Sequence, residues 1–288
     1  MKKRILVLIM FISACSQSLA DTESNINLDV AISHDDNLNI SPDDEFAIDS
    51  LFASVGASYN LNKKINYKSF FDSHLTLKYE NYQDTDGLNN TEFSAGIGYN
   101  IKPGAGFTKA TYILKGDIRV NDYETDIRDR TVYEATGIMS FWVTNTISMR
   151  TGLTARMRDS DSTVFDTKDF RLFINADLIL NRKSTLYSTL NLLTGDLTST
   201  IDQDDENEEI LDLINQADAI EFDPTFGDNM IAYKVNTDIA ALTLGYNYVF
   251  SRKQSLDFSA RYAIGKADFN VDYNATFINF SYLVSFGL

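Results

Sequence analysis

Two histidines, His34 and His74, are the side chains with the most direct potential for acid–base chemistry. His34 begins the run His34-Asp35-Asp36-Asn37, where a general base beside carboxylates could hold a cation and cleave a lipid ester. Neither histidine is the start of a His-x-Ser pair, because the following residues are Asp35-Asp36 and Leu75-Thr76. The spacing therefore favours a non-catalytic role, and the sequence predicts no catalytic residue, no metal ligand set and no cofactor.

A larger set of charged residues shares one feature: each lies on the polar side of a segment in which polar and apolar residues alternate. If these segments are strands of one closed sheet, the charged side chains line its lumen and focus an electric field there, as in a conduit for an anionic solute. The opposite signs nearly cancel, so pairing that fills the interior is an equal alternative. The predicted lumen-lining residues are Lys78, Lys115, Arg119, Arg150, Arg156, Arg158, Arg171, Arg261, Asp72, Glu80, Asp117 and Asp177.

The last segment, 276–288, shows most clearly which element positions such residues. Ile278, Phe280, Tyr282, Val284 and Phe286 alternate with mostly small or polar residues up to the end of the chain. A side-chain period of two indicates a β-strand whose two faces have different surroundings. An exposed apolar edge would promote aggregation, so the simplest arrangement pairs this edge by closing the sheet on itself.

Similar alternation begins at Asn25 and recurs along the whole chain, with turn residues between the segments. Residues 185–195 have no clear apolar side, and residues 231–250 change parity near Ala240, which predicts a β-bulge. Roughly twelve strands result, an even number as in bacterial barrels. We therefore expect an all-β fold: a single antiparallel, up-and-down transmembrane β-barrel.

The connections differ alternately in length and charge. Every second one is short and lacks Asp and Glu: Lys63-Lys64, Lys102-Pro103-Gly104, Thr144-Asn145-Thr146, Asn181-Arg182-Lys183-Ser184 and Ser251-Arg252-Lys253-Gln254. The others are longer and mostly acidic: 35–49, 83–90, 122–129, 159–169, 195–229 and 266–274. Short periplasmic turns and long outer loops are typical of outer-membrane barrels, which predicts that both termini lie in the periplasm.

The first twenty residues have the features of a signal peptide. Basic residues at 2–4 precede an apolar stretch, Ile5–Ile12, and Ser18-Leu19-Ala20 suits cleavage before Asp21. We expect residues 1–20 to be the signal peptide and residues 21–288 the barrel domain. Ile12-Ser13-Ala14-Cys15 resembles a lipoprotein box, so lipidation of Cys15 remains the alternative.

Bulk composition excludes several classes. The formal net charge of −16 argues against a nucleic-acid partner, which would need a basic surface. Beyond the N-terminus, no stretch reaches the roughly 18 apolar residues that a spanning helix requires. A soluble β-sandwich or lipocalin-like barrel also alternates, but it has no reason to sort its connections by length and charge.

The longest connection, 195–229, holds the acidic run 202–209, followed by apolar residues at helical spacing from Ile210 to Ile214. An acidic first turn suits a helix dipole, which predicts a short helix over the mouth or within the lumen. Carboxylates could bind calcium, but the run lacks the central glycine of an EF-hand loop. A solvated acidic loop facing lipopolysaccharide is the simpler interpretation.

Two resemblances add to this. The segment 276–288 resembles the C-terminal signal strand of Gram-negative outer-membrane β-barrels, although it ends Phe286-Gly287-Leu288 instead of on an aromatic residue. This implies an outer-membrane location, insertion by the barrel-assembly machinery, and contact with outer-membrane lipid and lipopolysaccharide; the oligomeric state stays open.

The segment 33–39 is similar to the Tyr-Asp-Asp/Ser-Asn-aliphatic stretch of barrels found with exopolysaccharide export or surface-lipoprotein assembly, with His34 in place of the aromatic residue. It implies a part in moving or anchoring a surface polymer. The predicted function is a passive channel or a structural or accessory envelope component. The alternative is a lipid hydrolase, since outer-membrane phospholipases and lipid A deacylases resemble this chain in strand number.

Overall fold

The computed structural model describes residues 22–104, 106, 108–202, 214, 217–267 and 271–287. Of Asp44, within the first of these ranges, it describes the backbone only. The signal peptide predicted over residues 1–20 and most of the acidic run lie outside these residues. In the described part, all thirteen strands belong to one antiparallel sheet. They are β1 (Thr22–Asp35), β2 (Ser50–Asn66), β3 (Ser69–Tyr82), β4 (Asn90–Ile101), β5 (Thr111–Tyr123), β6 (Arg130–Trp142), β7 (Ile147–Ser160), β8 (Thr167–Asn181), β9 (Ser184–Asp202), β10 (Ala219–Phe222), β11 (Met230–Ser251), β12 (Gln254–Ala267) and β13 (Asp272–Gly287).

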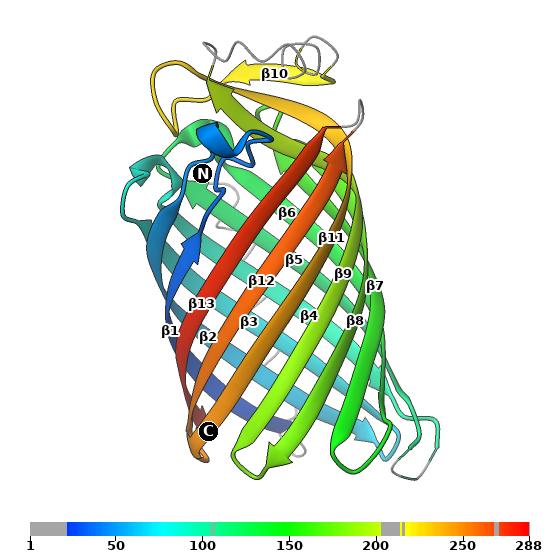
Figure 1. Ribbon diagram of the computed structural model, residues 1–288. Helices are drawn as coiled ribbons and strands as arrows, with labels where there is room; N and C mark the ends of the chain where they lie inside the picture. Colours follow the sequence, from blue (N-terminus) through cyan, green and yellow to red (C-terminus); the bar gives the residue numbers. More distant parts are fainter. Residues whose placement is uncertain are drawn as a thin grey trace.

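The sheet is closed, as the sequence predicts. Each wall strand pairs with the next along the chain, β13 pairs with β1, and β9 pairs with β11. The short β10 pairs only with β11 and stands outside the ring, so the wall has twelve strands in up-and-down order (Figure 1). Three short 3-10 helices in the described part of the chain, η1 (Asp44–Phe46), η2 (Asp86–Leu88) and η3 (Asp126–Arg128), lie in long connections.

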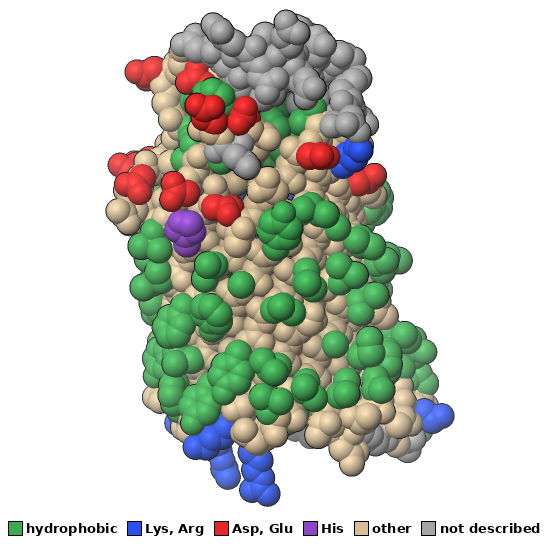
Figure 2. All heavy atoms as spheres, viewed as in Figure 1, with side chains coloured by type: hydrophobic (Ala, Val, Ile, Leu, Met, Phe, Trp, Pro, Cys, Tyr) green, Lys and Arg blue, Asp and Glu red, His purple; other side chains and the backbone are tan. Residues whose placement is uncertain are grey.

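Strand parity separates an apolar outer side from a polar inner side. On β1 the outward Leu28, Val30 and Ile32 are 43%, 51% and 53% exposed, and Leu77 on β3 is 54% exposed. Figure 2 shows hydrophobic side chains spread across the visible face of the wall. The apolar band is stable against lipid, and closure satisfies the backbone polar groups that lipid cannot. No helix within the described residues is long and apolar enough to cross a membrane.

The short connections and both ends of the described chain gather at one end of the barrel. Thr22 pairs opposite Lys63, and Asn25 opposite Gly287. This end carries Lys and Arg in Figure 2, while Asp and Glu gather at the opposite end. We call the end with the long connections the outer end, following the outer-membrane rule.

One of the predicted short turns is misplaced, and another connection is longer than predicted. Lys63 and Lys64 lie within β2, because the strand continues to Asn66. The Asn66 side chain accepts hydrogen bonds from the backbone N–H groups of Lys68 and Ser69 at 2.8 and 3.0 Å, which sets the turn further along the chain. The predicted turn 102–104 begins a longer connection that ends where β5 starts.

The prediction of a bulge at Ala240 is wrong. The register between β9 and β11 is continuous from Tyr248 opposite Ser184 to Met230 opposite Asp202. Polarity changes side because the surroundings change: the upper part of the two strands leaves the wall and packs among the loops. The expected loop 195–229 is likewise shorter, since β9 extends to Asp202.

Candidate functional site: the barrel interior and its lid

A three-stranded lid grows directly out of the wall. β8 last pairs with β9 at Gly195, and β12 last pairs with β11 at Thr237, yet β9 and β11 stay paired beyond these points. Gly195 has φ +141°, and a Cβ there would collide with the Lys168 carbonyl oxygen. Glycine thus permits the turn at which the pair leaves the wall. We define the lid as residues 196–202, 219–222 and 230–236.

One face of the lid packs against the tops of β12 and β13 and against the β1–β2 connection. Tyr233, Ile201 and Val235 are buried there with Tyr273, and the hydroxyls of Tyr233 and Tyr273 lie 3.1 Å apart. Ile40, from the β1–β2 connection, packs against this cluster. This apolar contact ties the lid to one side of the mouth.

The segment 33–39, which resembles part of polymer-export barrels, has a structural part in this contact. The Asn39 side chain is 2% exposed and donates to the backbone oxygens of Thr200 and Phe46 at 2.9 and 3.0 Å. The Thr200 N–H donates to the Asn39 carbonyl at 2.8 Å, and the Ser199 hydroxyl donates to the Ile40 carbonyl at 2.7 Å. The asparagine therefore fastens the first connection to the lid.

The other face meets Arg128 from η3, on a different part of the barrel rim. Its guanidinium donates to the Thr200 hydroxyl of the lid at 3.3 Å. In the connection between β10 and β11, it donates to Asp223 at 2.5 Å and to the Thr225 hydroxyl at 2.8 Å. The rings of Phe165 and Phe226 lie 4.7 and 4.9 Å from the guanidinium carbon, as in cation–π contacts. We call this group, Arg128, Asp223, Thr225, Phe165 and Phe226, the latch.

Asp223 is completely buried within the latch. The Thr200 hydroxyl donates to it at 2.9 Å and the Thr225 N–H at 3.1 Å. Burial alone raises the pKa of Asp223, but the Arg128 guanidinium and these hydrogen bonds outweigh it and hold the pKa below its usual range. The carboxylate is therefore charged at neutral pH and pairs with the arginine.

The lid consequently lies across the outer mouth. Its partners come from the β1–β2, β5–β6 and β7–β8 connections and from the tops of β12 and β13, which surround the opening. Figure 1 shows β10 and the upper parts of β9 and β11 over the top of the barrel. From the sequence we expected only a solvated acidic loop or a short helix in the connection 195–229.

Below the lid, most of the predicted lumen residues point inward and form ion pairs with neighbours. Lys78 binds Glu80 at 2.6 Å, and Arg150 binds Asp177 at 3.3 Å. Asp117 lies 3.3 Å from His74, and Asp72 accepts a hydrogen bond from Asn100. Arg171 lies 3.8 Å from Glu134, and Arg119 lies 3.7 Å from Glu92.

Arg156 and Arg158 both bind Asp169, at 2.9 and 2.8 Å. The three arginines of β7 that looked like a positive bias in the sequence are thus paired with carboxylates of β8. Within the described residues, Lys115 and Arg261 have no acidic group within the 4 Å of an ion pair.

Solvent exposure separates a hollow region from a filled one. The side chains of Arg150, Arg119 and Lys78 are 51%, 36% and 33% exposed although they face inward. On the β7–β8 side, the Arg156 side chain is 18% exposed and that of Asp169 only 1%. Pairing therefore fills the interior along β7 and β8 but leaves space along other strands.

A cavity of about 400 Å³ marks this space on the inner side of β1, β2, β3, β12 and β13. It brings together three of the predicted residues, Lys78, Glu80 and Arg261, and the Arg261 guanidinium lies 5.0 Å from the centre of the Phe277 ring. Asp29 also lines the cavity. Sequence reasoning did not single out Asp29 or Phe277, although both stand on the inner parity of their strands.

The histidines do not form a hydrolytic site. His34 faces outward, with its Nε2 3.4 Å from an Asp49 carboxylate oxygen, and His74 faces inward beside Asp117. Among the hydrogen bonds of the described residues, neither ring meets a serine or threonine hydroxyl. The described residues also contain no group of three His, Cys, Asp or Glu side chains placed to hold a metal ion.

Comparison with known proteins agrees with this geometry. No protein-family model matches the chain, and no curated protein sequence does. Among solved structures, an outer-membrane channel from Pseudomonas putida F1 is similar, with 10% identity, 93% of this chain and 97% of the other covered, and a TM-score of 0.59.

Lower similarity links the chain to the KdgM porin in complex with disordered oligogalacturonate (9% identity, 90% and 99% covered, TM-score 0.45). The toluene transporter TodX of Pseudomonas putida is similar to the same degree (9% identity, 93% and 90% covered, TM-score 0.45). At these identities the likeness concerns the fold. The chain folds as a closed antiparallel β-barrel of twelve wall strands, the fold that it shares with the outer-membrane channel from Pseudomonas putida F1.

Proposed function

We propose that this protein is a channel for small anionic solutes whose outer mouth is closed by the lid. The observation that carries the proposal is Arg261 in its cavity: an arginine on the inner wall, beside an aromatic ring, with no acidic group within ion-pair distance among the described residues. An arginine with no carboxylate within ion-pair distance, in a low-dielectric wall, attracts anions from water.

The surroundings of Arg261 favour one bound anion over a general positive field. Lys78 shares the cavity but is paired with Glu80, and Asp29 adds a negative charge to the lining. Ser33, Ser54 and Asn279 contribute hydroxyl and amide groups. A solute with one carboxylate or phosphate and further polar groups suits this lining best.

Conductance in a planar bilayer tests the proposal. The refolded mature protein is compared with Arg261→Gln and with a control, Arg182→Gln, in an exposed turn outside the lumen. In a salt gradient, we expect reversal potentials that indicate anion preference for the parent and the control, and a several-fold weaker preference for Arg261→Gln. Cation preference in the parent, or equal preference in all three, would contradict the proposal.

The lid favours a second candidate, a closed barrel with a structural role in the envelope. A cover with its own apolar cluster and a buried ion pair closes the mouth tightly. No conductance from the parent, together with none from a variant whose latch is broken, would favour this second function.

A further inference from the structure

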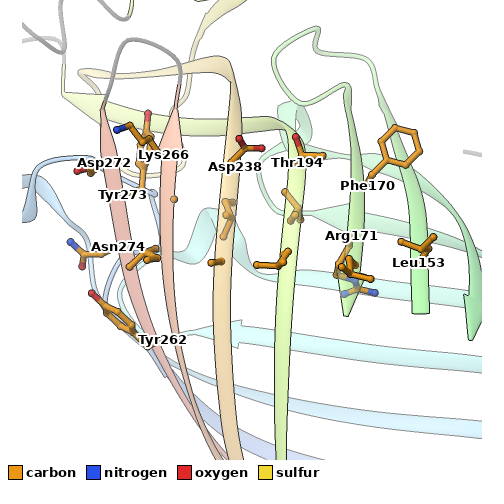
Figure 3. A pocket seen from close by; sticks show the side chains of 17 residues that line it. Leu153, Phe170, Arg171, Thr194, Asp238, Tyr262, Lys266, Asp272, Tyr273 and Asn274 are labelled. Atoms are coloured by element: carbon orange, nitrogen blue, oxygen red, sulfur yellow. The ribbon is translucent and has the colours of Figure 1, made fainter. Parts of the chain in front are cut away.

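A groove of about 810 Å³ lies on the outer surface of the wall, below the lid, and spans β7 to β13 (Figure 3). Most of its lining residues belong to the outward parity of their strands, and the pocket size is within the range of roughly 300–1,000 Å³ typical of ligand sites. The apolar lining comes mainly from Leu153, Phe170, Leu172, Leu192, Tyr262 and Ile264.

A barrel wall is normally convex, so this hollow needs a cause. β9 and β11 turn toward the mouth at Gly195 and Thr237 to form the lid, while β8 and β12 end beside them in the wall. Ala240 lines the groove three residues from Thr237, and its small side chain leaves space between larger neighbours. The groove therefore lies next to the point at which the lid strands leave the wall.

Charged residues stand along the outer edge of the groove. Lys266 lies between Asp238 and Asp272 in the strand register, and all three line the groove. On the opposite side, Lys168 stands two positions before the lining residue Phe170 and is exposed. Neither lysine takes part in an ion pair among the described residues.

We propose that this groove binds one lipid A molecule of the outer leaflet, with an acyl chain on the apolar floor and its phosphates at Lys168 and Lys266. The groove opens from the apolar band, where the surrounding medium is lipid, and an unfilled apolar hollow would forfeit dispersion contacts. It lies at the outer end, where the phosphorylated glycolipid forms the leaflet. Because Asp238 and Asp272 flank Lys266, the proposal includes divalent ions that bridge these carboxylates and the lipid phosphates.

The proposal distinguishes a specific site from ordinary lipid contact. Ala240→Cys, in the groove and three residues from the last β11–β12 pair at Thr237, carries a polarity-sensitive fluorophore. Ala53→Cys, outward on β2 and three residues from the outer end of that strand, carries the same label as a control. Both proteins are refolded without lipid and titrated in detergent micelles with lipid A and Mg²⁺. We expect a saturable fluorescence change at position 240 and only a gradual change at position 53.

Two further arms identify the ligand. Titration with phosphatidylethanolamine should give a response at position 240 at least tenfold weaker, and Lys168→Gln combined with Lys266→Gln should weaken lipid A binding by a similar factor. Equal fluorescence responses at positions 240 and 53 would show that the groove contacts lipid no more specifically than the rest of the wall, and would overturn the proposal. An equal response to phosphatidylethanolamine would overturn the assignment to lipid A.

Discussion

Replacing Arg128 by alanine should loosen the lid. Arg128 is the only described residue that donates to the Asp223 carboxylate from another connection, and its side chain is 14% exposed while that of Asp223 is completely buried. Removing one partner of a buried pair costs about 3–5 kcal/mol, because the other charge remains without compensation. Thr200 and the Thr225 N–H still donate to Asp223, which places the loss near the lower limit.

A loss of about 3 kcal/mol changes the ratio of closed to open lid about 100-fold, since 1.4 kcal/mol corresponds to a factor of ten. Single-channel recording of the refolded protein measures this ratio as the fraction of time spent open. We expect rare openings in the parent and frequent ones in Arg128→Ala.

Arg128→Lys is the matched variant. It keeps the positive charge but loses the planar group that donates twice and lies between Phe165 and Phe226, so it should be intermediate. Heat-modifiable migration in gels confirms that each variant is a folded barrel. If folded Arg128→Ala opens no more often than the parent, the latch does not hold the lid closed.

Three further predictions follow from the wall and the lid. Leu77→Arg, on the lipid side, should cost about 2–4 kcal/mol in refolding titrations, whereas Thr76→Arg, inside, should cost much less; equal losses would show that the faces are misassigned. Gly195→Ala should raise the open fraction, because alanine rarely adopts φ +141° and its Cβ would collide with a backbone oxygen; unchanged openings would refute that reason. The lowered pKa of Asp223 means that its contribution to closure is complete above the usual Asp range and is lost as pH falls through the lowered value. Recordings at pH 7 and pH 5 should therefore show the same open fraction, and opening at pH 5 would contradict the pKa direction.

Alternation made the wall predictable from sequence. On β1, β3 and β13 lipid lies outside and water inside, so an apolar residue such as Leu77 and a polar one such as Thr76 reveal their faces by type alone. The same reasoning identified which charged residues share the inner side. Their pairing was not predictable, because neighbours such as Arg156 and Asp169 depend on the register between strands that sequence does not give.

The lid could not be predicted from the sequence, because in this region the apolar side of the strands does not face lipid. Tyr233 and Val235 are on the inner parity of β11, and the loops, not lipid, bury them. The sequence shows this only as a change of parity, which a bulge would also produce. The latch could not be predicted for another reason: Arg128 and Asp223 are 95 residues apart in the chain, and only the three-dimensional fold brings them together.

Because β9 and β11 pass from the wall into the lid within one hydrogen-bond ladder, the cover is not an independent flap. Amide protons on the paired part of the lid should exchange as slowly as those of the upper wall, unlike those of surface loops. Moving the cover would also deform the wall strands beneath it. Bilayer thickness and lateral tension would therefore act on the mouth through the same two strands.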